Sequence, residues 1–165
     1  MRKASLHKNS PIMLHDAICA RLPHAGRMCL LERLESWDAD SITCIATSHR
    51  DADNPLRRGG RLHAVAGVEY VAQAMALHGN LLSRPVLRRV EGTDTQPAMG
   101  YLASVRDLKL DLEDLGTVVE DLRIMARRLS GDASGFIYEF EIRAGARAVL
   151  SGRLAAKLLA TGTAA

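Results

Sequence analysis

The most regular apolar pattern in the first half of the chain is helical and runs from Gly67 to about Ser83, before Pro85. The segment begins GVEYVAQAMALHG, and its apolar residues face almost every direction around the axis, so we expect a buried helix. Glu69 and Gln73 are four residues apart and therefore share one face of that helix. A carboxylate there is costly unless it is paired or used in chemistry, which makes Glu69 the first functional candidate.

The second half of the chain alternates apolar and polar residues with a period of two, which is typical of half-buried strands. Gly116, the pair Gly131-Asp132, and Gly145 separate the alternating segments as turns. This pattern predicts an antiparallel meander of four strands around residues 108–112, 122–127, 136–143 and 150–158.

The segments before the long helix predict smaller elements. A short helix over residues 16–22 should end at Pro23, which places His24 in a turn. Residues 28–37 and 41–49 are interpreted as two antiparallel strands joined by a hairpin turn. Two loops, 50–61 and 90–97, flank the long helix and are rich in turn-forming residues.

Together these elements predict an α+β fold in which about six strands enclose one long helix. We expect one domain over residues 11–160, with a flexible N-terminal arm at residues 1–10 and a flexible tail at residues 161–165. One sheet can cover only part of a helix that is apolar on all sides. A second copy or a related chain is therefore expected to cover the rest.

Composition narrows the function classes. The chain has 165 residues, of which 47% are apolar, and a net charge of +3, which is too weakly basic to favour nucleic-acid binding. No run of ~18 apolar residues predicts a membrane span, and no secretory signal is evident. Cys19, Cys29 and Cys44 are odd in number and lack CxxC spacing, which favours reduced structural thiols in a cytoplasmic protein over disulfides or zinc ligands.

Several residues around the long helix could carry chemistry. Glu69 is either a general acid or base or a structural carboxylate. Gln73 could orient Glu69, bind substrate or be a satisfied core amide. The backbone amides of Gly67 and Val68, at the start of the helix, could polarise a carbonyl oxygen.

The histidines and arginines offer further candidates. His24 lies in a turn and His63 just before the helix, whereas His78 lies nine positions beyond Glu69, at another level. Basic patches flank the helix and are either solvated surface or docking sites for an acidic partner; they contain Arg57, Arg58, Arg61, Arg84, Arg88 and Arg89. No metal-site spacing, GxSxG motif or phosphate loop occurs, so we expect neither a metal nor a cofactor.

Two motifs make the chain resemble a known family. LPHAGRMCLLERL, at residues 22–34, and GVEYVAQAMA, at residues 67–76, are similar to the hotdog-fold 3-hydroxyacyl acyl-carrier-protein dehydratases. The branch it resembles most is that of bacterial aryl-polyene gene clusters, and the likeness covers about residues 11–160. The resemblance implies a long helix wrapped by an antiparallel sheet and a double-hotdog dimer with active sites at the interface.

The resemblance also implies roles for single residues. In the family, a helix carboxylate and a histidine move the protons that dehydrate a β-hydroxyacyl thioester, and Glu69 occupies the carboxylate position. The better-known members carry the histidine in a GHFPGHP loop fourteen residues earlier, where this chain has Pro55. We therefore expect His24 to be the partner of Glu69, with His63 as the runner-up. The arginine patches become candidate contacts for acyl carrier protein.

Three functions remain open at this stage. The first is a (3R)-hydroxyacyl-acyl-carrier-protein dehydratase that uses Glu69 and His24 on an acyl-carrier-protein or coenzyme A thioester. The second is a non-catalytic hotdog subunit that completes a heteromeric dehydratase. The third is an acyl thioesterase on the same fold, which ranks last because the chain shows no HGG-type loop to place an attacking water.

Overall fold

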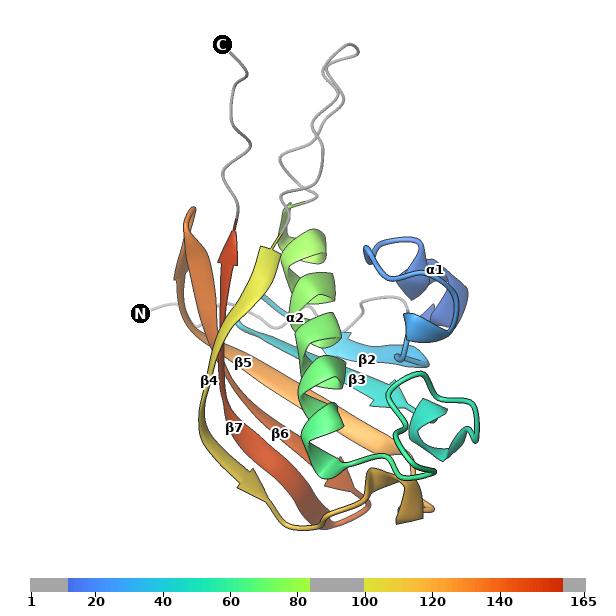
Figure 1. The fold of residues 1–165 in the computed structure, drawn as a ribbon. Helices are drawn as coiled ribbons and strands as arrows, with labels where there is room; N and C mark the ends of the chain where they lie inside the picture. The colour runs from blue at the N-terminus through green and yellow to red at the C-terminus, as the bar shows by residue number, and fades with distance from the viewer. Residues whose placement is uncertain (1–11, 84–99, 159–165) are drawn as a thin grey trace, which may run out of the picture.

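A computed structural model describes residues 12–83 and 100–158. Within them a seven-stranded antiparallel sheet curves around one long helix, α2 (Gly67–Ser83), as Figure 1 shows. The strands are β1 (Met13–Leu14), β2 (Arg33–Trp37), β3 (Ser41–Ala46), β4 (Gly100–Leu110), β5 (Leu122–Asp132), β6 (Gly135–Ala144) and β7 (Arg147–Leu158). A short helix, α1 (His15–Cys19), and the 3-10 turns η1 (Gly26–Met28), η2 (Ser48–Arg50), η3 (Ala64–Ala66) and η5 (Leu115–Thr117) complete the described part.

The predicted meander is correct for β5, β6 and β7, which are neighbours in chain order. It is wrong for β4, the first of the four predicted strands in the sequence. The sheet order is β1-β2-β3-β5-β6-β7-β4, so β4 lies beside β7 at the far edge. Both edges of β5 are already occupied, by β3 and by β6. The available edge is that of β7, where Val105 pairs with Leu154 and Leu110 with Leu150. Alternation along a sequence predicts the two faces of a strand but not its neighbours.

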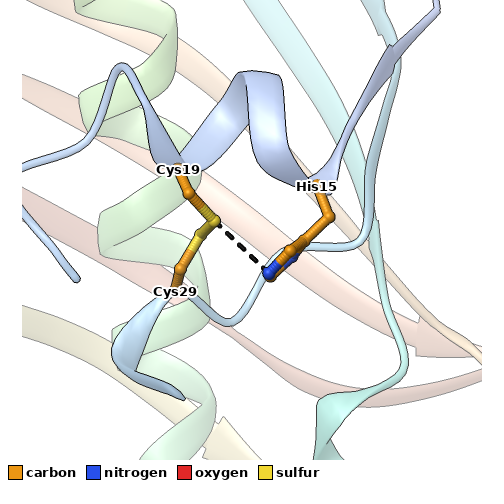
Figure 2. A group of neighbouring side chains, drawn as sticks. All are labelled: His15, Cys19 and Cys29. Atoms are coloured by element: carbon orange, nitrogen blue, oxygen red, sulfur yellow. Dashed lines mark hydrogen bonds between the residues drawn. A yellow bond between two sulfur atoms is a disulfide. The ribbon is translucent and has the colours of Figure 1, made fainter. Parts of the chain in front are cut away.

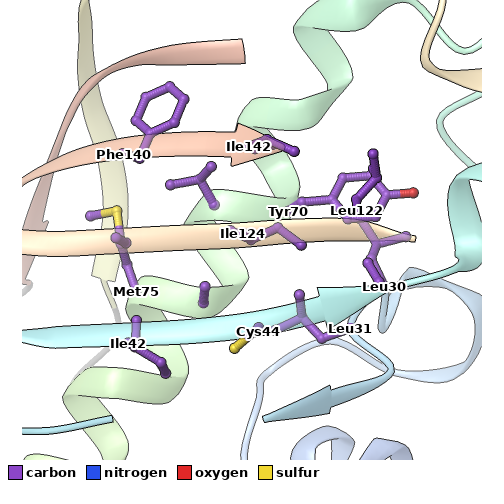
Figure 3. Packing of buried hydrophobic residues seen from close by; sticks show 14 of the residues in the cluster. Leu30, Leu31, Ile42, Cys44, Tyr70, Met75, Leu122, Ile124, Phe140 and Ile142 are labelled. Carbon is purple, nitrogen blue, oxygen red and sulfur yellow. The ribbon is translucent and has the colours of Figure 1, made fainter. Parts of the chain in front are cut away.

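The core lies between α2 and the concave face of the sheet (Figure 3). As the alternation predicts, Leu122 and Ile124 of β5 and Phe140 and Ile142 of β6 are buried against the helix, none of them more than 4% exposed. The helix begins very close to the sheet, because a Cβ on Gly67 would lie 2.6 Å from Leu150 Cδ2. Burial of this apolar surface is the main stabilising contribution that fixes α2 in place.

The predicted hairpin before α2 is present, but its first strand is shorter than expected. The side chain of Asp38 organises the turn by accepting hydrogen bonds from the backbone N–H groups of Asp40 and Ser41, both at 2.8 Å. Strand β2 begins only at Arg33. The carbonyl of Met28 and the N–H of Leu30 form hydrogen bonds with the side chain of Gln73 on α2, and not with a neighbouring strand.

The prediction that all three cysteines are free thiols is wrong, because Cys19 and Cys29 form a disulfide. The chain between them turns back on itself, so residues separated by ten positions meet, and spacing alone did not reveal this. Cys44 is the free, buried thiol of β3, and burial raises its pKa to about 12.

Some expectations fall outside the described residues: the N-terminal arm, the C-terminal tail, the loop at residues 90–97, and Arg84, Arg88 and Arg89. Among the helices that the structure does describe, none combines the length and apolar character needed to cross a membrane.

Candidate active site

The structure brings His24 and Glu69 together, although 45 positions separate them in the sequence. His24 Nε2 lies 3.0 Å from Glu69 Oε1, and each side chain is 27% exposed. Glu69 stands in the first turn of α2, and His24 in the turn between α1 and η1. The pair is therefore an imidazole and a carboxylate in direct contact that solvent can reach.

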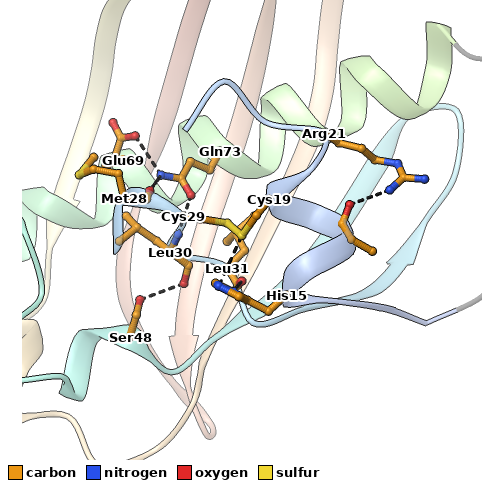
Figure 4. Close-up of a disulfide and its surroundings, with 11 residues drawn as sticks. His15, Cys19, Arg21, Met28, Cys29, Leu30, Leu31, Ser48, Glu69 and Gln73 are labelled. Carbon is orange, nitrogen blue, oxygen red and sulfur yellow. Dashed lines mark hydrogen bonds between the residues drawn. A yellow bond between two sulfur atoms is a disulfide. The ribbon is translucent and has the colours of Figure 1, made fainter. Parts of the chain in front are cut away.

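Gln73 lies one helical turn beyond Glu69 and binds both Glu69 and the segment after His24 (Figure 4). Its Nε2 donates to Met28 O at 2.6 Å and to Glu69 Oε1 at 3.2 Å. Its Oε1 accepts from the backbone N–H of Leu30 at 2.9 Å, and the residue is fully buried. With both ends of its amide occupied, Gln73 fits two of the predicted roles, that of a satisfied core amide and that of the residue that orients Glu69.

Ser48, Asn54 and Tyr70 form a second set of polar side chains beside the segment that contains Leu30, and the sequence analysis did not predict them. Ser48 Oγ donates to Leu30 O at 2.9 Å and lies 3.0 Å from Tyr70 Oη, which also accepts from Asn54 Nδ2 at 3.0 Å. Burial raises the pKa of Tyr70, so its hydroxyl stays protonated. The one signal in the sequence was Tyr70 itself, since a buried tyrosine hydroxyl needs a partner.

The sequence predicts a backbone amide of Gly67 without a hydrogen-bond partner, but in the structure this amide is bonded. The turn η3 runs directly into α2, and the Gly67 N–H donates to the carbonyl oxygens of Ala64 and Val65. Because a 3-10 turn precedes this helix, a donor that would otherwise lack a partner is satisfied. The predicted carbonyl-polarising role is thus lost for Gly67, and for Val68 it stays a prediction.

His63 occupies a different place from His24. Its backbone forms a bridge with Asp114, and its side chain lies in a shallow, open depression beside Arg61, Val65 and Leu110. Among the described residues the polar contacts of the Glu69 carboxylate are those with His24 and Gln73. The histidine that the geometry pairs with Glu69 is therefore His24.

The three described arginines of the predicted docking patch are held to different degrees. The Arg57 guanidinium donates to the carbonyl oxygens of Asp51, Gly60 and His49 and thereby organises the loop before α2. Arg58 is exposed, and within the described part of the chain its guanidinium bonds only to neighbouring carbonyl oxygens. Arg61 forms ion pairs with two acidic residues, Glu113 and Asp114. Arg58 is thus the most available of the three for an acidic partner.

Comparison with known proteins identifies the family of the chain. The family model described as ApeP dehydratase, of the ApeP-like family, matches residues 17–158. No curated protein sequence matches the chain.

Solved structures share the fold. A component of the dehydratase heterocomplex ApeI:P from Xenorhabdus doucetiae is 21% identical with a TM-score of 0.72, covering 87% of this chain and 91% of that one. A putative thioesterase from Silicibacter is 16% identical with a TM-score of 0.54, covering 90% and 93% of the two chains. A thioesterase from Pseudomonas aeruginosa is 15% identical with a TM-score of 0.52, covering 77% and 80%. At these identities the likeness establishes the hotdog fold.

Proposed function

Because the chain belongs to the ApeP-like dehydratase family, we propose that it takes part in the dehydration of a (3R)-hydroxyacyl thioester carried on acyl carrier protein, in fatty-acid-like or polyene biosynthesis. The observation that carries the proposal is the 3.0 Å contact between His24 and Glu69. Dehydration needs one group to take the Cα proton and another to protonate the departing hydroxyl. A histidine and a carboxylate in direct contact, both open to solvent, can supply the two transfers.

The reaction balances with these two groups alone. The Cα–H bond breaks as one group takes the proton, the Cα–Cβ double bond forms, and the Cβ–O bond breaks as the other group protonates the hydroxyl. One water leaves, and a proton exchanged between His24 and Glu69 restores the starting state. Gln73 keeps the carboxylate oriented throughout, because its own bonds to Met28 and Leu30 do not involve substrate.

A partner subunit completes this proposal. Strand β4 is at the edge of the sheet, and four of its large apolar side chains are at least 39% exposed: Tyr101, Leu102, Val105 and Leu110. An exposed apolar edge strand is a natural site for pairing with another chain. We propose that a second hotdog subunit, either a copy of this chain or a related one, pairs along β4. The similar chain from Xenorhabdus doucetiae belongs to a dehydratase heterocomplex, which favours a related chain.

The decisive experiment supplies a 3-hydroxyacyl thioester of acyl carrier protein to the purified chain, alone and with a candidate partner subunit. Mass spectrometry of the carrier follows the loss of water, and a thiol reagent follows hydrolysis of the thioester. We expect water loss without thiol release. Thiol release without water loss would make the chain a thioesterase, and unchanged substrate in both samples would contradict the proposal. If water loss requires the partner and continues when Glu69 is replaced by Gln, this chain is a non-catalytic subunit.

A further inference from the structure

The turn that carries His24 is closed by a covalent bond. Cys19 is the last residue of α1, Cys29 directly follows η1, and the disulfide between them joins the two ends of the turn (Figure 2). His24 lies at the middle of the ten-residue separation. A change at this bond therefore acts on the one segment that brings the imidazole to Glu69.

Little else fixes the imidazole. Within the described residues His24 Nδ1 has no hydrogen-bond partner, so the contact of Nε2 with Glu69 is the one polar restraint on the ring. The orientation of His24 then depends on the packing around its buried Nδ1 and on the backbone of its turn. One end of the turn is held to α2, because Gln73 binds the residues on either side of Cys29. The disulfide extends that restraint to the other end, at Cys19.

His15 stands beside the disulfide in a defined orientation. Its Nδ1 lies 2.7 Å from Leu31 O, and a carbonyl oxygen can only accept, so Nδ1 carries the proton. In the neutral imidazole Nε2 then presents a lone pair, 3.4 Å from Cys19 Sγ. A disulfide sulfur has no proton to give to that lone pair, whereas a thiol has one. The arrangement is thus better suited to the reduced form of Cys19, where an imidazole base promotes the reactive thiolate.

We propose that Cys19 and Cys29 form an exchangeable disulfide that holds His24 beside Glu69, with His15 as the base that activates Cys19 and a dithiol as the reductant that opens the bond. This inference rests on the proposed function of His24. It also reconciles the disulfide with the cytoplasmic location expected from the sequence, because thiols in a reducing compartment are kept in exchange with small thiols and dithiols.

The steps balance as ordinary thiol–disulfide exchange. In oxidation, His15 Nε2 takes the proton of the Cys19 thiol, and the thiolate attacks a small disulfide, forming a mixed disulfide and releasing one thiol. The Cys29 thiolate, whose proton goes to solvent, then attacks Cys19 Sγ and expels the second thiol. Two electrons pass to the small disulfide. In reduction, a dithiol attacks the half-buried Cys19, Cys29 leaves as a thiolate, and the second thiol of the reductant releases Cys19.

The test uses the full chain, with its partner subunit where activity needs one, equilibrated in buffers of oxidised and reduced dithiothreitol. Alkylation followed by mass spectrometry counts the free thiols. Cys44 is an internal reference, because it is buried and should label only after denaturation. Amide hydrogen exchange measures residues 20–28 against strand β3 in the same sample. Dehydration is assayed in both states and in the C19S/C29S double variant.

We expect reduction to expose two labelled thiols, to accelerate amide exchange in residues 20–28 but not in β3, and to lower kcat/KM about tenfold or more. Reoxidation should restore the activity. The double variant should be as slow as the reduced chain and insensitive to redox buffer. H15Q should slow formation of the disulfide about tenfold without changing the activity of the oxidised chain.

Either of two results on reduction would overturn the inference: unchanged amide exchange in residues 20–28, or unchanged activity of a chain that is active when oxidised. Failure of the proposed function is distinguishable, because a chain inactive in both redox states still gives a thiol count and an exchange pattern. Those two measurements judge the redox inference independently of activity.

Discussion

His24 and Glu69 meet at 3.0 Å through Nε2 and Oε1, one from a turn and the other from the first turn of the central helix. The two elements have different anchors: α2 is fixed by the core, and the turn is held to it through Gln73. A pair built in this way combines a rigid carboxylate with a histidine whose place depends on its own segment. The two side chains should therefore respond differently to changes in their surroundings.

Substitution of Glu69 by Gln should abolish most of the dehydration. The amide keeps the size of the side chain but cannot exchange a proton, so kcat should fall about 10²-fold to 10⁴-fold. The melting temperature should change little, since Glu69 is partly exposed. The matched control is Glu113→Gln, whose side chain is 92% exposed and should retain full activity. Equal turnover by the Glu69→Gln protein would remove Glu69 from the chemistry.

The two candidate histidines can be separated by the same kind of substitution. His24→Gln removes the group that contacts Glu69, and kcat should drop about 10²-fold or more. His63→Gln changes a side chain in the open depression near Leu110, and the loss should be far smaller. Steady-state kinetics of both variants, each measured across pH, provide the comparison. If the larger loss occurs at His63, the runner-up is the partner of Glu69 in the active assembly.

Gln73→Leu should destabilise the protein as well as slow it. The substitution leaves the buried N–H of Leu30 and the carbonyl of Met28 without their partner, which costs about 3 kcal/mol of unfolding free energy. Urea unfolding measures this cost. Ser83→Ala, at the exposed end of the same helix, serves as control and should stay within about 0.5 kcal/mol of the parent. A loss of activity without any loss of stability would show that Gln73 acts only on Glu69 or on substrate.

Some features of the fold and of the site could be predicted from the sequence, and others could not. Periodicity predicted α2 and the buried faces of β5 and β6, because the spacing of apolar residues within a single element indicates which of its side chains are buried. It could not predict that β4 pairs with β7, or that Cys19 meets Cys29, since both depend on distant segments. The contact of His24 with Glu69 followed from the family resemblance. The occupation of both ends of the Gln73 amide was visible only in three dimensions.

Stability should fall as the solution is acidified below neutrality, because two histidines are buried. Burial lowers the pKa of His49 and of His78, which contacts Tyr138 Oη through Nδ1 and the carbonyl of Asp38 through Nε2. Above the ordinary histidine pKa of about 6.5, both are neutral in the folded and unfolded states. Below it the unfolded chain binds the protons first, so the free energy of unfolding decreases by up to about 1.4 kcal/mol per pH unit for each histidine.

Urea titrations at several pH values between about 7.5 and 5 test this slope. His78→Gln should be less stable at neutral pH, yet it should lose part of the acid sensitivity, because one of the two protonations is removed. Identical pH slopes for the parent and the variant would mean that the pKa of His78 is the same in the folded and unfolded chain.

Two glycines of α2 should respond in opposite ways to the same substitution. Gly79→Ala adds a Cβ that meets no atom of the other described residues within 4 Å, apart from its chain neighbours and its own helix backbone, so the gain in helix propensity should stabilise the protein by about 0.5–1 kcal/mol. Gly67→Ala is at the first residue of α2, where the propensity gain is smaller, and its Cβ would lie 2.6 Å from Leu150 Cδ2 and 3.1 Å from Ile142 Cδ1. Both neighbours are fully buried, so repacking should cost about 1–3 kcal/mol and reverse the sign of the effect on stability.

Gly67 also begins the helix that carries Glu69, so its variant should lose activity along with stability, whereas Gly79→Ala should keep its activity. Urea unfolding and a dehydration assay on the two proteins give the comparison. Equal stabilisation by both would show that Leu150 moves aside freely and that the close approach of α2 to the sheet does not fix the position of Glu69.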